Sequence, residues 1–363
     1  MNAASRLLKL LLSRGDYLER FEQSQLKRLL PILEAAHESV LGKLAATQGE
    51  WTREWLAQMS TDIDAIYTQA MSKLSGELTP ELQSLLDDEL AYAQEHLGHV
   101  MAGVSVTTPA SATLWASIAA LPAASGSTLD SLMEALSLNT RRAVIEAIQA
   151  GMASGDTLDQ MVRRLRGTTI RRASWRKGPD GRRVYVPGVY EGGAMEDVST
   201  RQAKAFARTA IMHVSNAARE ALYGENQDII KGYQHIATLD GDTCLACGAM
   251  DGREYGLDDP RPALPLHPSC RCLYLPVLKS WRELGIDADE LPPGSRASMD
   301  GLVPEYETYA DRIAKASRAR RIELLGPARA SMYERGMSLR EMISQDGKPY
   351  TLKELMAKRK GAE

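Results

Sequence analysis

The chain has 363 residues, of which 44% are hydrophobic and 25% are charged, and its formal net charge at pH 7 is −3. A chain longer than about 250–300 residues is expected to form more than one domain, and this composition is ordinary for a globular protein. The slightly negative charge excludes a global attraction for nucleic acid, so any DNA contact must come from a local basic patch. No apolar run approaches the roughly 18 residues that a membrane-spanning helix needs.

The four cysteines are too few for a disulfide framework in a chain of this length. The apolar run at residues 6–12 is too short for a secretory signal and lacks a cleavage site, so the expected compartment is a reducing cytoplasm. Only two phenylalanines are present among many Leu, Ala and Met residues, which favours aliphatic helix packing over an all-β core.

Residues 1–125 predict an N-terminal helical region, either a bundle or an extended arm, because apolar side chains recur at helical spacing. The first stripe consists of Leu26, Leu29, Leu30, Leu33, Val40, Leu41 and Leu44. Thr79, Pro80 and Glu81 predict the start of a further helix, since they suit its cap and first turn. The stretch 104–128, rich in Ser, Thr, Ala and Pro, predicts a linker.

Residues 163–183 contain nine Arg or Lys and one acidic residue around a Gly-Pro-Asp-Gly turn. This pattern predicts a basic β-hairpin within 163–190. Its candidate contact residues are Arg171, Arg172, Trp175, Arg176, Lys177, Arg182, Arg183 and Tyr185. Such a hairpin can lie against the phosphate backbone of double-stranded DNA. The alternatives are a solvated excursion or a contact with an acidic protein surface.

The clearest helix spans 197–224, with Gly224 as its stop. His213 within it is interpreted as a packed histidine rather than a ligand. Short strands are predicted at 233–240 and 273–278, so the segment between them is a long loop.

All the cysteines lie in this Cys/His loop, residues 240–275, where a C-x2-C pair precedes an H-x2-C-x-C half-site by 19 residues. Thiolates and imidazoles are zinc donors, and a stretch this rich in Gly and Pro cannot bury much apolar surface, so metal binding would supply its folding free energy. We predict one structural Zn2+ per chain. The candidate donors are Cys244, Cys247, His267 and one of Cys270 or Cys272.

Other interpretations of the Cys/His loop are reduced structural cysteines or a disulfide. A thioredoxin-like redox pair is not expected, because the first pair does not open a helix in a βαβ pattern. A zinc hydrolase needs an open coordination position and a general base, and the chain contains no H-E-x-x-H or H-x-E element. We therefore expect a closed site and no catalytic residue.

Several short motifs recur together around this loop. They are Ala207-Arg208-Thr209, Asn216 to Arg219, Asp240 with Thr243-Cys244 and Cys247, Asp251-Gly252, and His267 to Cys272. Over roughly residues 140–275 the sequence resembles the phage Mu F-like head morphogenesis family, the minor head proteins of tailed phages.

The resemblance implies a virion component of low copy number at the portal vertex, which acts in procapsid assembly and in DNA packaging or ejection. It implies the portal protein as partner, with major capsid or scaffolding protein and packaged double-stranded DNA as further candidates, and no membrane. The implied location is the capsid interior or portal vertex, and the host cytoplasm during assembly. The competing functions are a DNA-binding module that uses the basic hairpin and a zinc-dependent nuclease or toxin-like domain.

The predicted fold is mainly α with a small α+β module in three consecutive parts. An N-terminal helical region covers 1–125. The domain that resembles the Mu F-like family covers 126–280, and a helical C-terminal tail covers 281–363. Two capping boxes, at 338–341 and 351–354, support helices in that tail.

Overall fold

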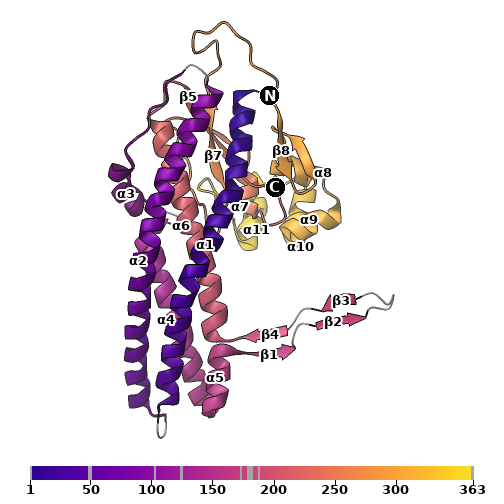
Figure 1. The fold of residues 1–363 in the computed structure, drawn as a ribbon. Coiled ribbons are helices and arrows are strands. Elements are labelled where there is room, and N and C mark those ends of the chain that lie inside the picture. The colour runs from indigo at the N-terminus through magenta and orange to yellow at the C-terminus, as the bar shows by residue number, and fades with distance from the viewer. Residues whose placement is uncertain are drawn as a thin grey trace. The chain divides into compact units, whose positions relative to one another are not determined.

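The computed structural model describes residues 2–47, 51–101, 104–122, 126–171, 174–177, 183–186 and 189–360, and the side chains of these residues outside 168–191, 196–199 and 359–360. The described chain is mainly helical, with a few short antiparallel strands (Figure 1). The predicted fold class, mainly α with a small mixed module, is confirmed at this level.

The helices are α1 (Ala3–Ala45), α2 (Arg53–Val100), α3 (Ser111–Ala120), α4 (Leu129–Ser154), α5 (Leu158–Arg166), α6 (Ala194–Gly224), α7 (Leu245–Met250), α8 (Tyr309–Lys315), α9 (Arg318–Leu325), α10 (Pro327–Glu334), the 3-10 helix η2 (Arg340–Met342) and α11 (Leu352–Lys360). The strands are β1 (Gly167–Arg171), β2 (Ser174–Lys177), β3 (Arg183–Val186), β4 (Val189–Gly192), β5 (Ile230–Ile236), β6 (Glu254–Gly256), β7 (Leu273–Leu278), β8 (Ser295–Ser298) and β9 (Gly301–Pro304).

The chain forms two compact units, and both are discontinuous in sequence. The first unit comprises residues 1–21, 82–129 and 208–363, and the second comprises 22–81 and 130–207. The three consecutive domains predicted from sequence describe the order of segments along the chain, whereas these two units describe packing in space. The predicted domain boundaries therefore stay a prediction.

The second unit is built from long helical segments that bury one apolar stripe each. Segments of α1, α2 and α6, all of α4 after Leu129, and the whole of α5 contribute to it. The fully buried side chains include Leu29, Leu33, Val40, Leu44, Ile63, Tyr67, Leu74, Val144, Ile148, Met161 and Leu165. These positions recur every three or four residues, so burying the stripes fixes which face of each helix points inward.

Helix α2 continues through Pro80, where the sequence predicted a new helix. Leu78, Leu82, Leu85 and Leu86 form one unbroken buried stripe across this position. A proline inside a helix removes one backbone hydrogen bond at a cost of about 3 kcal/mol, and burying several leucines at roughly 1.5–3 kcal/mol each outweighs that cost. The prediction of a new start was therefore wrong.

The strands of the basic segment pair as a two-part antiparallel hairpin. Strand β1 pairs with β4, and β2 pairs with β3 in a register that sets Trp175 opposite Tyr185 and Lys177 opposite Arg183. The predicted hairpin is present in the backbone. Its turn, residues 178–182, lies outside the described residues.

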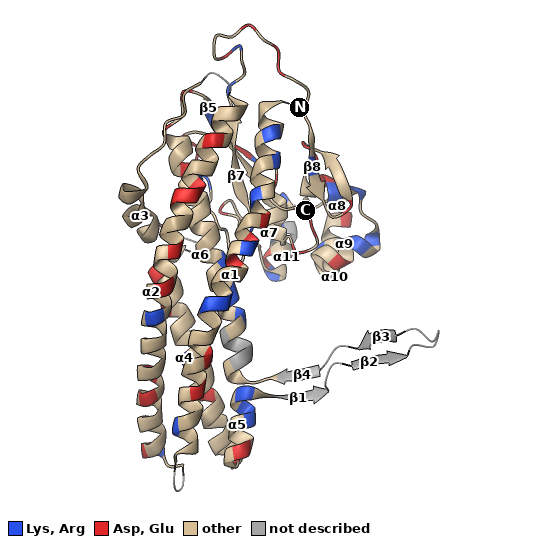
Figure 2. Cartoon of the chain, viewed as in Figure 1, with Lys and Arg blue, Asp and Glu red and all other residues tan. Residues whose placement is uncertain are grey.

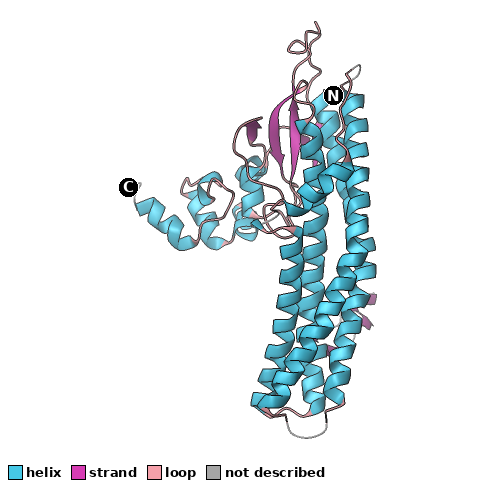
Figure 3. Cartoon of the chain, turned by 90° about the vertical axis from the view of Figure 1, so that its left-hand side faces the viewer, coloured by secondary structure: helices cyan, strands magenta, loops and turns pink. Residues whose placement is uncertain are grey.

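The first unit contains a three-stranded antiparallel sheet, and Figure 3 draws the strands in magenta. The strand order of this sheet is β6-β5-β7. Strands β5 and β7 match the two strands predicted on either side of the Cys/His loop. Helix α6 ends at Gly224, as predicted, and its residues Ala210, Val214 and Ala218 are buried.

The predicted linker at 104–128 includes a helix and makes hydrogen bonds to the rest of the first unit. Helix α3 lies within it and buries Ile118. The side-chain amide of Asn226 donates to the Thr107 carbonyl and accepts from the Thr107 amide, both at 2.8 Å. This segment is therefore anchored in the first unit and is not a free connection.

A buried ionic cluster joins three helical segments of the first unit. The carboxylate of Glu89 on α2 is fully buried and accepts hydrogen bonds from Arg14 Nε at 2.7 Å, Ser215 Oγ at 2.7 Å and Arg219 Nε at 3.1 Å. Such a group is tolerated in a core only when charge and hydrogen bonds compensate it, so the cluster fixes the register of α1, α2 and α6 here.

The C-terminal segment packs as part of the first unit. Its core consists of Leu239, Tyr309, Ile313, Leu325, Ala330, Met332, Leu339, Met342 and Leu355. Both predicted capping boxes form, with reciprocal hydrogen bonds between Ser338 and Glu341 and between Thr351 and Glu354. Leu239 precedes the Cys/His loop, so the tail and the loop share one core.

Candidate metal centre

The Cys/His loop is closed by the two strands that flank it. Strand β5 leads into the first pair of cysteines, and β7 follows the last one. Their antiparallel register sets Ile236 opposite Leu273, which brings the start and the end of the loop together. Residues more than 20 positions apart in sequence therefore meet at one end of the sheet.

The C-x2-C pair lies at the beginning of α7. Cys244 is the N-cap, and its Sγ accepts a hydrogen bond from the Cys247 amide at 3.4 Å. The pair therefore opens a short helix. The neighbouring strands of β5 are antiparallel, so the thioredoxin-like βαβ pattern is still not formed.

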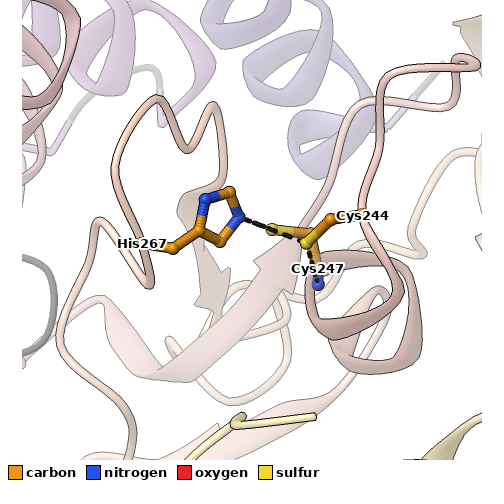
Figure 4. Close-up of side chains that lie close together, drawn as sticks. All are labelled: Cys244, Cys247 and His267. Atoms are coloured by element: carbon orange, nitrogen blue, oxygen red, sulfur yellow. Dashed lines mark hydrogen bonds between the residues drawn. The ribbon is translucent and has the colours of Figure 1, made fainter. Parts of the chain in front are cut away.

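The donor atoms of the loop converge on Cys247. His267 Nε2 lies 3.2 Å from Cys244 Sγ and 3.1 Å from Cys247 Sγ (Figure 4), and Cys247 Sγ lies 3.7 Å from Cys270 Sγ. Two donor triads result, Cys244/Cys247/His267 and Cys247/Cys270/Cys272, each with donor atoms within 4.8 Å of one another. The structure thus brings all five predicted donors into one cluster.

These separations fit a metal site and not a disulfide. The four cysteines are free thiols. Zn–S bonds of about 2.3 Å at tetrahedral angles place two sulfurs about 3.8 Å apart, close to the 3.7 Å between Cys247 and Cys270. A disulfide needs sulfurs about 2.05 Å apart. The cluster can therefore hold a metal ion.

Hydrogen bonds within the cluster favour the thiolate at Cys244, whereas at Cys247 they raise the pKa of the thiol. The pKa of Cys244 is lowered to about 4, mainly by its hydrogen bond with Cys247 and also by that with His267. The pKa of His267 is raised to about 9 by its hydrogen bond to Cys244. His267 Nδ1 lies 2.8 Å from the Pro268 carbonyl, a contact that leaves Nε2 facing the sulfurs.

Motif residues outside the donor set hold the loop in place. Arg271, between two cysteines, makes a bidentate ion pair with Asp240 at 2.6 and 2.8 Å. Asn216 on α6 donates to the Cys272 carbonyl at 3.2 Å, and Thr209 Oγ accepts from the Ser269 amide at 3.1 Å. The Ala-Arg-Thr and Asn-Ala-Ala-Arg motifs thus anchor the second half-site to α6.

The Asp-Gly motif connects the loop to the C-terminal segment. Asp251 accepts hydrogen bonds from the Ala237 amide at 2.8 Å and from the Tyr309 amide at 2.9 Å. Arg296 lies 3.3 Å from both carboxylate oxygens, and both side chains of this ion pair are buried. Gly252 adopts a positive φ of 79°. Sequence reasoning missed Arg296 and Tyr309 because no local pattern marks a partner that lies 45 or 58 residues away.

Two histidines outside the donor set are buried. His213 Nε2 lies 2.9 Å from the Ile118 carbonyl, which fits the interpretation of a packed histidine. His235 on β5 packs edge-on against Tyr274, and burial lowers its pKa to about 4. Neither belongs to a described group of metal donors.

The basic hairpin residues belong to the second unit. Arg171 lies on β1, Trp175, Arg176 and Lys177 lie on β2, and Arg183 and Tyr185 lie on β3. Arg172 and Arg182 lie outside the described residues, as do the side chains of the whole set. Whether the hairpin contacts DNA or protein therefore stays a prediction.

Comparison with known proteins returned one family. Residues 142–275 match the family described as Phage Mu protein F like protein, which confirms the resemblance seen in the motifs. The matched range contains the hairpin, the second half of α4, helices α5 and α6, and the Cys/His loop. The comparison with curated proteins returned no match, and neither did the comparison with solved structures. Among the described helices, none is long and apolar enough to cross a bilayer.

Proposed function

We propose, from the membership of residues 142–275 in the Phage Mu protein F-like family, that the chain is a minor head protein of a tailed phage that acts in head morphogenesis. The observation that carries the proposal is this match together with the geometry of the motif residues. The motifs supply the donors, hold the second half-site against α6, or connect the loop to the C-terminal segment. The chain would reside in the virion, at the portal vertex or inside the capsid, and in the host cytoplasm during assembly.

The proposed cofactor is one structural Zn2+. Its ligands would be Cys244, Cys247, His267 and Cys270, because the 3.7 Å separation of Cys247 and Cys270 matches an edge of the tetrahedron. Cys272, the fifth donor, is buried in the same cluster and would remain a thiol beside the ion. When bound, zinc would cross-link the two half-sites, and its binding free energy would stabilise the folded loop.

We further propose that the chain is not an enzyme. A catalytic zinc keeps one coordination position open for water or substrate, whereas here five soft or borderline donors form two triads that share Cys247, and three of the four cysteines are buried. Multiple-turnover cleavage of DNA or RNA that His267→Ala abolishes in a folded protein would instead assign a nuclease.

The proposed principal partner is the portal protein, with major capsid or scaffolding protein as a further candidate. Figure 2 shows Lys and Arg positions interspersed with Asp and Glu positions along α1, and mostly Asp and Glu positions along α2. This pattern suits solvated or protein-contacting helices better than a continuous DNA-binding face.

Density of the chain in a procapsid or virion map, compared with particles that lack it, tests this proposal. We expect the difference density next to the portal ring, in few copies. Difference density spread over the whole shell, or particles that assemble without incorporating the chain, would overturn the proposed role.

A second function, binding to packaged double-stranded DNA, is favoured by one observation. The backbone pairing of β2 and β3 forms the predicted hairpin in the most basic stretch of the chain. Phosphate contacts by such a hairpin would be independent of base sequence.

A further inference from the structure

The carboxyl-terminal turn of α2 carries a second group of metal donors, Glu95, His96 and His99. The spacing places His99 three residues after His96 and four after Glu95. At 100° per residue, the three side chains fall within an arc of about 100° on one helix face. One turn of helix therefore presents two imidazoles and one carboxylate together.

The donor atoms of this triad lie within 4.8 Å of one another, and the two imidazole rings have centroids 6.2 Å apart. Glu95 and His99 are exposed, and His96 is half-buried. Among the described residues, neither Glu95 nor His99 has a hydrogen-bond or ion-pair partner, so binding an ion would break no described interaction.

His96 is the fixed member of the triad. Its ring packs edge-on against Tyr92 with centroids 4.1 Å apart. Tyr92 is itself held by a hydrogen bond from its hydroxyl to the Leu10 carbonyl at 2.8 Å.

The local charge favours a cation. Helix α2 ends at Val100, one residue after His99, and unpaired carbonyls at a helix carboxyl terminus carry partial negative charge. The Glu95 carboxylate adds a full negative charge. Two imidazoles and one carboxylate suit Ni2+, Cu2+ or Zn2+, whereas Ca2+ and Mg2+ prefer sites made of oxygen donors.

We propose that Glu95, His96 and His99 form a second metal site, separate in its donors from the Cys/His loop, that binds one borderline divalent transition-metal ion. Three protein donors on one helix face leave the remaining coordination positions directed to solvent. The site is therefore of the open kind, unlike the closed cysteine cluster.

The test is titration of the full-length, zinc-loaded protein with Ni2+, followed by calorimetry. We expect one additional Ni2+ per chain. Glu95→Gln and His99→Gln should each weaken this binding by at least roughly tenfold, and the double variant should abolish it. Asp87→Asn, which removes an exposed carboxylate two turns earlier on the same helix, should bind Ni2+ like the wild type.

A parallel titration with Co2+ assigns the donors. Cobalt bound by nitrogen and oxygen lacks the intense charge-transfer absorption of cobalt thiolates, so the additional equivalent should add none. Equal Ni2+ binding by the wild type and the double variant, or thiolate absorption from the additional ion, would overturn the proposal. Both exposed positions accept Gln within a helix, and circular dichroism verifies that the variants fold.

Discussion

Cys244 and Cys272 lie in the same cluster but should differ in what their loss costs. Cys244→Ser removes a proposed ligand, so bound zinc should fall from about one equivalent to well below half. The free energy of unfolding should fall by about 4 kcal/mol or more, because metal binding is coupled to folding. The matched variant Cys272→Ser should retain zinc. Elemental analysis and thermal melting measure both effects, and equal zinc loss in the two variants would contradict the proposed ligand set.

Gly248 follows Cys247 and packs directly against Tyr309 of the C-terminal core, so only a residue without a side chain fits there. A Cβ there would lie 2.3 Å from the ring of Tyr309, which is itself fully buried. Gly248→Ala should therefore destabilise the fold by about 1–3 kcal/mol through overpacking. Gly224→Ala is the control, since a Cβ at Gly224 meets no atom within 4 Å. Chemical denaturation compares the two, and equal midpoints would refute the packing explanation.

At the scale of elements, β8 is held to α7 by the buried pair of Arg296 and Asp251. Arg296→Met leaves a buried carboxylate without its counter-charge and should cost about 3–5 kcal/mol. Arg282→Met breaks the exposed pair with Asp289 and should cost less than about 1 kcal/mol. Limited proteolysis of the segment 295–350 gives an independent measure. Equal protease resistance in the two variants would show that the ion pair of Arg296 and Asp251 does not hold β8 in place.

The basic hairpin gives a prediction that separates its two possible partners. Replacing Arg171, Arg172, Arg182 and Arg183 with Ser should lower DNA affinity, with zinc content unchanged. The slope of log affinity against log salt should become shallower by nearly one for each phosphate that the variant no longer neutralises. A control replaces four exposed helical arginines, Arg6, Arg20, Arg53 and Arg142. If the wild type has negligible DNA affinity and the hairpin variant fails to enter procapsids made without DNA, the hairpin binds protein.

Elements with a strong local pattern were predictable from sequence. The apolar stripes, the stop at Gly224, the two capping boxes and the strands around the Cys/His loop depend on neighbouring residues, and the structure contains all of them. The donor residues were predictable because their types and spacing carry the chemistry. The continuation of α2 through Pro80 was not predictable, because the free energy gained by burying a long stripe of leucines exceeds the local cost of the proline. The ion pair of Arg296 with Asp251 was not predictable either, because its two residues lie far apart in sequence and meet only through tertiary packing.

At the scale of the whole molecule, the two compact units are interleaved in sequence. The segment 126–280 contains the donors of the Cys/His loop but lacks 1–21, 82–125 and 281–363 of the first unit and 22–81 of the second. Expressed alone, it should therefore lack a cooperative thermal transition, whereas the full chain should have one. Circular dichroism melting checks this, and a cooperative transition in the isolated segment would make it an independent domain.

The hydrogen bonds between the first helix and residues near position 300 have a consequence for synthesis. The Asn2 amide donates to the Pro292 carbonyl, and the Gly294 amide donates to Ser5 Oγ. The ribosome synthesises the chain from its amino terminus. About 290 further residues must therefore be added before the start of α1 can form these hydrogen bonds. At about 5–20 residues per second, this delay is roughly 15–60 seconds, during which the amino-terminal end of α1 lacks these two partners. Docking of this end should therefore be completed only when translation is nearly finished.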